Sequence, residues 1–133
     1  MSTHLAASPQ AYRESAVLTA PPERLVVMLY DGAGRFLHQA VVTMRAGDIQ
    51  TCHERLRRAE AIIDHLLETL DMSQGEVAQQ LESIYIFCQR LIAEARIRLD
   101  PEKLEQVRGL LAELREAWDQ IGTAGSGSQA APA

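Results

Sequence analysis

Apolar residues recur at intervals of three and four along four long segments of the chain, with polar residues between them. This spacing is typical of amphipathic helices, because an α-helix has about 3.6 residues per turn. The predicted helices span about 22–45, 49–70, 75–99 and 101–121. The strict alternation of apolar and polar residues that marks a half-buried strand is missing from the sequence.

Helix start signals lie between these segments. Asp48 is a good N-cap for the second helix. Ser73 and Glu76 have the spacing of a capping box, which predicts the start of the third. Asp100 followed by Pro101 indicates the start of the fourth. Because the connections are short, the pattern predicts an all-α fold, an antiparallel up-down four-helix bundle at residues 22–121.

The two ends of the chain differ from this pattern. Residues 1–21 are expected to form an N-terminal segment with a short helix or cap, anchored by Tyr12. Residues 122–133 are rich in Gly, Ser and Ala and have no large apolar anchor, so we expect a disordered tail. The first residues show neither a secretory signal nor a run that spans a bilayer, which predicts a cytoplasmic protein without membrane insertion.

The first predicted helix is apolar over more of its surface than one bundle seam requires. One interpretation is burial on two sides, by the bundle and by the N-terminal segment. The other is a groove that accepts an amphipathic helix of a partner. The groove candidates are Leu25, Met28, Leu29, Gly32 and Phe36.

Two glycines, Gly32 and Gly34, lie inside this helix, and each costs about 1 kcal/mol relative to alanine. Our hypothesis is that Gly32 lets another backbone approach closely, either a neighbouring helix or a bound partner. Gly34 is expected to point elsewhere.

Composition and charge exclude several function classes. The net charge is −5 and the basic residues are scattered among acids, so a nucleic-acid interface is not expected. None of the four histidines follows a glutamate by three positions, which excludes the ligand motif of di-iron bundles. Cys52 and Cys88 lie in apolar segments and indicate core packing. We therefore expect no cofactor and no metal.

Two further interpretations stay open at this level. A histidine phosphotransfer domain would use an exposed His65, although Asp64 and Glu68 beside it would repel a phosphoryl group. Alternatively, the apolar stripe of the first helix forms a weak homodimer and binds no client.

Several stretches together resemble one known family. They are AYRESAVLTAPPERLVVMLYDGAGRFL, AGD, RAEAIIDHLLETLD, GEVAQQLESIYIF and ELREAWDQI, in this order between Ala11 and Ile121. In order, spacing and loop placement they resemble the flagellar secretion chaperones of the FliS family. The LYDGA element, which contains Tyr30, is the most specific of them.

The resemblance implies a cytoplasmic, non-enzymatic chaperone for flagellin. Such a protein binds the disordered C-terminal region of newly made flagellin, as helices joined by extended stretches, and prevents premature polymerisation. It also assists delivery to the flagellar type III export apparatus, through a membrane component of the export gate. Tyr12 matches the tyrosine of the family's N-terminal Ala-Tyr pair, which implies a role in gate docking or in capping the groove.

Overall fold

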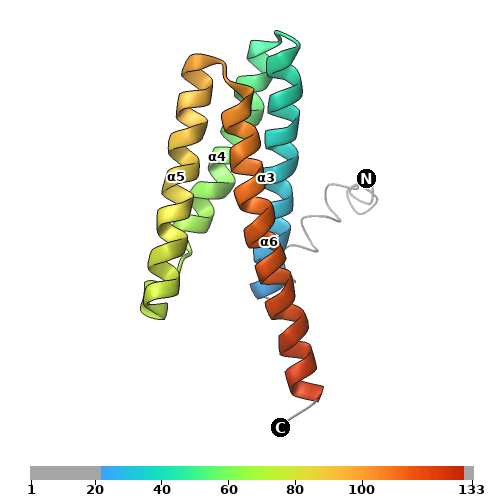
Figure 1. The fold of residues 1–133 in the computed structure, drawn as a ribbon, viewed down its shortest axis with the longest axis vertical. Helices are drawn as coiled ribbons and strands as arrows, with labels where there is room; N and C mark the ends of the chain where they lie inside the picture. Colours follow the sequence, from blue (N-terminus) through green and yellow to red (C-terminus); the bar gives the residue numbers. More distant parts are fainter. Residues whose placement is uncertain (1–21, 131–133) are drawn as a thin grey trace, which may run out of the picture.

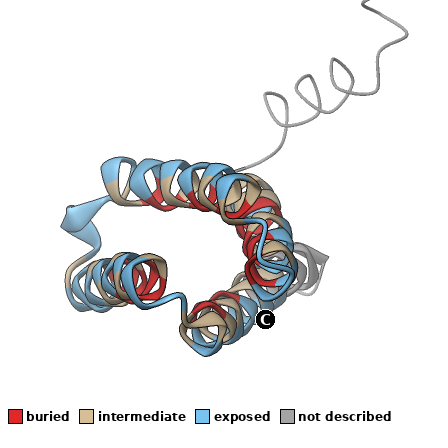
Figure 2. Cartoon of the chain, turned by 90° about the horizontal axis from the view of Figure 1, so that it is seen from above, coloured by how far each residue is buried: buried red, intermediate tan, exposed pale blue. Residues whose placement is uncertain are grey.

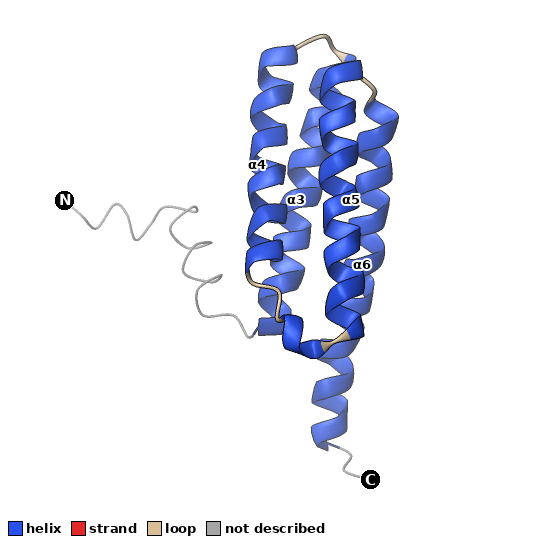
Figure 3. Cartoon of the chain, turned by 90° about the vertical axis from the view of Figure 1, so that its left-hand side faces the viewer, coloured by secondary structure: helices blue, strands red, loops and turns tan. Residues whose placement is uncertain are grey.

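A computed structural model describes residues 22–130 of the chain, with side chains from Glu23 to Gln120. Four helices run alternately up and down: α3 (Pro22–Arg45), α4 (Ile49–Glu68), α5 (Glu76–Arg98) and α6 (Pro101–Ala130) (Figure 1). One short 3-10 turn, η1 (Met72–Gln74), precedes α5. The described part contains no strand (Figure 3), and the predicted all-α bundle is confirmed. The expected N-terminal segment lies outside the described residues.

The end of α6 differs from our expectation. We placed the end of the last helix near residue 121 and a disordered tail at 122–133, whereas α6 continues to Ala130. Its last turns extend past the other three helices (Figure 1). This stretch has no proline before Pro132, so its backbone N–H groups can continue the helical hydrogen-bond pattern.

The four helices form a ring in which α3 is the most closely packed member. The backbone of α3 approaches both α4 and α6 closely, whereas α5 approaches the same two helices over a smaller area. Buried residues face the common interior (Figure 2). The largest fully buried side chains include Leu37, Leu56, Ile63, Tyr85, Ile92, Leu104 and Leu111. Every helix therefore contributes to one core.

Two of the predicted helix starts have the expected side-chain caps. Asp48 Oδ1 accepts a hydrogen bond from the backbone N–H of Thr51 at 3.2 Å, which caps α4. Asp100 Oδ1 accepts one from the N–H of Glu102 at 3.0 Å, at the start of α6. Both bonds satisfy an N–H group that has no partner within its helix.

The predicted capping box at Ser73 and Glu76 is wrong. The hydroxyl of Ser73 donates to Asp71 Oδ1 at 2.6 Å, and Asp71 also accepts the N–H of Ser73 at 3.0 Å. The charged carboxylate is the stronger acceptor, so it captures Ser73 and caps η1 instead. Gly75, with a φ of 71°, then leads into α5 without a side-chain cap.

Candidate functional site

The bundle is open at the end where α3 and α5 begin and α4 ends. A cavity of about 530 Å³ lies there, which we call the mouth cavity. Its apolar lining comes from Val26 of α3, Leu66 of α4, Leu70 just after α4, and Val77 and Leu81 of α5. Such a lining favours the apolar side chains of a bound segment.

The charged residues at the mouth cavity are acidic. Among the residues with described side chains, Glu23 and Asp71 line it, and no lysine, arginine or histidine does. Hydrogen bonds from the side chains of Ser73 and Gln74 hold the pKa of Asp71 below its ordinary value, so this carboxylate stays charged. The cavity therefore favours a neutral or basic segment over an anionic one.

Three aromatic side chains meet through their polar ends, and two of the three line the mouth cavity. The hydroxyls of Tyr30 on α3 and Tyr85 on α5 are 2.5 Å apart, across the diagonal of the bundle. Trp118 Nε1 on α6 donates to the hydroxyl oxygen of Tyr30 at 3.0 Å. Tyr85 and Trp118 also line the cavity. Burial raises the pKa of both tyrosines, so both hydroxyls keep their hydrogens.

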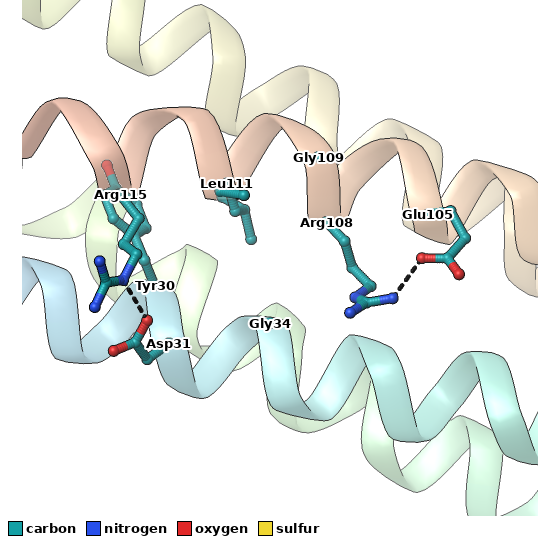
Figure 4. Close-up of a pocket in the computed structure, with 9 residues that line it drawn as sticks. Tyr30, Asp31, Gly34, Glu105, Arg108, Gly109, Leu111 and Arg115 are labelled. Atoms are coloured by element: carbon teal, nitrogen blue, oxygen red, sulfur yellow. Dashed lines mark hydrogen bonds and ion pairs between the residues drawn. The ribbon is translucent and has the colours of Figure 1, made fainter.

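A second depression, the side groove, lies between α3 and α6 and has a volume of about 410 Å³ (Figure 4). Its charged residues are already paired. Arg115 Nε donates to Asp31 at 2.8 Å, and Arg108 donates to Glu105 at 2.6 Å. The side groove is therefore electrically balanced, and it offers less apolar surface to a client than the mouth cavity does.

The five predicted groove residues all lie on α3, and as a client site they stay a prediction. Leu29 and Phe36 are half-buried and pack against the core. Leu25 and Met28 are half-buried but lie outside the core cluster, and Gly32 is buried. None of the five lines the mouth cavity, and Tyr12 lies outside the described residues.

The two glycines of α3 face different surroundings. A Cβ atom placed on Gly32 would lie 3.3 Å from Ile62 Cδ1, so this glycine allows α4 to pack closely. For Gly34 no atom lies within 4 Å of the same position. Gly34 lines the side groove instead. Of the two alternatives for Gly32, the structure therefore supports close approach of a neighbouring helix.

Large exposed apolar side chains gather on α5 and its flanks rather than at the start of α3. Among the described residues they are Met72, Val77, Ile86, Ile97 and Leu99, together with Val42 near the end of α3. Val77 is 62% exposed and lines the mouth cavity. It is the residue that joins exposed apolar surface to the cavity.

The sequence contained a signal for the mouth cavity that our prediction did not use. Tyr30 and Tyr85 lie in the first half of their helices, and Trp118 lies in the second half of the fourth. In an up-down bundle, the starts of the first and third helices and the end of the fourth lie at one end. Three aromatic residues with polar ends at one end of a bundle indicate a site there.

The structure shows the surroundings of His65, the candidate of the phosphotransfer interpretation, which requires an exposed histidine with room for a phosphoryl group. His65 is exposed on α4, and the neighbouring Asp64 and Glu68 are exposed as well. Among the described side chains, no three of His, Cys, Asp and Glu cluster so as to hold a metal ion. None of the described helices has the length and apolar character needed to cross a membrane.

Comparison with known proteins shows that the relatives of this helical bundle are secretion chaperones. Curated relatives with the name flagellar secretion chaperone FliS occur in Salmonella typhimurium, Vibrio cholerae and Bacillus subtilis. The Salmonella relative is 40% identical over 110 residues, which are 81% of this chain and 82% of the relative. The Vibrio relative is 36% identical over 117 residues, which are 84% of this chain and 86% of the relative. The Bacillus relative is 32% identical over 110 residues, which are 83% of this chain and 82% of the relative.

The family model described as flagellar protein FliS matches residues 5–125. This chain belongs to the FliS family, and the resemblance found in its motifs is confirmed. The relatives are named as chaperones rather than as enzymes.

Proposed function

We propose that this protein is a cytoplasmic chaperone that binds the disordered C-terminal region of flagellin. Binding prevents premature polymerisation and keeps the subunit ready for the flagellar type III export apparatus. The observation that carries the proposal is the mouth cavity, a partly open apolar cavity in a member of a flagellar chaperone family.

The lining and the charge of the mouth cavity support an apolar polypeptide segment as its occupant. An amphipathic helix buries its apolar residues in such a site, and the adjacent exposed Val77 extends the contact beyond the cavity. Coupled folding and binding of a disordered segment typically buries about 1,000–3,000 Å² and costs about 2–5 kcal/mol for ordering the chain. That cost keeps the affinity moderate, so the client remains releasable at the export gate.

A charge placed at the mouth cavity tests the proposal. We expect Val77→Glu to weaken the binding of a flagellin C-terminal fragment at least about tenfold, because the carboxylate must be desolvated beside Glu23 and Asp71. Folding should be unaffected, since Val77 is 62% exposed. Isothermal titration calorimetry with the purified fragment measures the change in Kd.

Ile86→Glu is the matched control. Ile86 is also on α5 and 46% exposed, but it follows Val77 by nine positions, about two and a half turns, and faces the opposite side of the helix. Its Kd should stay within about twofold of the unchanged chain. Equal weakening in both variants, or in neither, would argue against the mouth cavity as the client site.

Two further parts of the proposal concern other partners. Tyr12 is our proposed contact with the membrane component of the export gate once the client is bound, or a cap of the empty groove. The alternative is that the apolar stripe of the first helix forms a homodimer instead of binding a client. The mass in solution, measured with and without the flagellin fragment, distinguishes a homodimer from a complex with the client.

A further inference from the structure

The cluster of Tyr30, Tyr85 and Trp118 has one more hydrogen-bond donor than it uses in bonds within the cluster. Trp118 Nε1–H and the hydroxyls of Tyr30 and Tyr85 offer one hydrogen each. One hydrogen bond joins Trp118 to Tyr30, and another joins the two tyrosines. One hydroxyl hydrogen is therefore left without an acceptor among the described residues.

The arrangement of the bonds indicates which tyrosine carries this hydrogen. If Tyr30 donates to Tyr85, the bonds form a chain from Trp118 to Tyr30 to Tyr85, in which each bond polarises the next. If Tyr85 donates instead, the oxygen of Tyr30 accepts twice, and that mutual strengthening is lost. The chain is the better arrangement, so the remaining hydrogen belongs to Tyr85, which lines the mouth cavity.

A buried donor without an acceptor is costly, so a ligand that supplies an acceptor is favoured. Tyr85 is only 2% exposed but lines the mouth cavity, so few waters compete with a ligand in the cavity for this donor. The raised pKa of Tyr85 follows from the same burial and keeps its hydrogen in place. Since Glu23 and Asp71 disfavour an anionic ligand, the matching acceptor is a neutral carbonyl oxygen.

We propose that the Tyr85 hydroxyl donates a hydrogen bond to a carbonyl oxygen of the client segment in the mouth cavity. This inference rests on the proposed function and adds the polar contact that fixes the segment within an apolar site. Main-chain carbonyls inside a helix already have partners, whereas those of the last turn and of extended stretches do not. The segment in the mouth cavity thus presents the end of a helix or an extended stretch to Tyr85.

Two substitutions, each of which removes one tyrosine hydroxyl, test the proposal by comparison. Tyr85→Phe and Tyr30→Phe both remove the bond between the two hydroxyls, and Tyr30→Phe also removes the acceptor of Trp118 Nε1, so it loses more contacts of the folded chain. Only Tyr85→Phe removes the donor to the client. We expect its Kd for the flagellin C-terminal fragment to rise about five- to tenfold, whereas Tyr30→Phe stays within about twofold.

A measurement on the unchanged chain covers the case in which a variant fails to fold. The chain has three tyrosines, and labelling their Cζ atoms with ¹³C gives one NMR signal for each. Addition of the fragment should move the Tyr85 signal, because the Cζ shift depends on the hydrogen bonding of the attached hydroxyl.

The outcomes separate this inference from the proposed function. If the unchanged chain binds the fragment and Tyr85→Phe binds equally well, the proposed contact is wrong and the chaperone role stands. Equal weakening in both variants, or weakening in Tyr30→Phe alone, also overturns it, because the donor role would then not belong to Tyr85. If the unchanged chain does not bind the fragment, both proposals fail.

Discussion

Replacing Gly32 by leucine is expected to lower the free energy of unfolding by about 1–3 kcal/mol, the range seen when a packed contact is overfilled. The reason is the contact with α4, since even a Cβ atom at this position would lie 3.3 Å from Ile62 Cδ1. A full leucine side chain must push the two helices apart along a tightly packed interface. Removal of glycine returns only about 1 kcal/mol of helix propensity, so the packing term dominates. Urea unfolding followed by circular dichroism measures the difference.

Gly34→Leu is the matched control, two positions later in the same helix. It has no atom within 4 Å of the ideal Cβ position and borders the open side groove. We expect the free energy of unfolding to stay unchanged or to rise by up to about 1 kcal/mol, the gain in helix propensity. If both variants were equally stable, the close packing of α3 on α4 would not explain Gly32.

Alkaline pH is expected to destabilise the bundle through its buried thiols and phenols. Burial raises the pKa of Cys88 from 9.0 to about 11, and burial also raises the pKa of Cys52, Tyr30 and Tyr85. The unfolded chain therefore releases these protons first and binds fewer protons than the folded chain, so stability falls as pH rises. The Cys88 contribution is complete below pH 9 and is lost as pH rises through about 11. It amounts to about 2–3 kcal/mol, at about 1.4 kcal/mol per pKa unit.

Urea midpoints measured at pH 8, 9.5 and 11 test this expectation. Cys88→Ala serves as the control, because it removes the thiol. The variant should be less stable at pH 8, since it leaves a small cavity, but its stability should decline less between pH 9 and 11. A free energy of unfolding that is the same at pH 8 and pH 11 would contradict the prediction.

The fold was predictable because local signals and the apolar period agree along most of the chain. Asp48 and Asp100 cap their helices as expected, since each accepts a hydrogen bond from a backbone N–H of the first helical turn. The start of α5 was not predictable in the same way. Two residues suited to capping, Asp71 and Ser73, compete there, and the carboxylate binds the hydroxyl. The continuation of α6 to Ala130 runs against composition, which favours a tail at this point.

The candidate site was harder to predict than the fold. The width of the apolar surface on α3 indicated a groove there, but apolar pattern alone does not say which stripe a neighbouring helix covers. Phe36 packs against the core, and Gly32 lies against Ile62. The mouth cavity arises from residues far apart in sequence, such as Val26, Leu70 and Val77, where three helix ends meet. That meeting depends on the relative lengths and positions of the helices, which periodicity does not encode.

The smaller contact area of α5 has a consequence for the motions of this bundle. Its backbone approaches α4 and α6 less extensively than α3 does, so displacing α5 breaks fewer close contacts than displacing any other wall of the ring. Regions with few such contacts open first in local unfolding, and in hydrogen exchange the amides of α5 should lose protection before those of α3. Because Val77, Leu81 and Tyr85 belong to this helix, the opening motion also widens the mouth cavity. Under the proposed function, a long client segment would then enter from the side, without threading through a rigid ring.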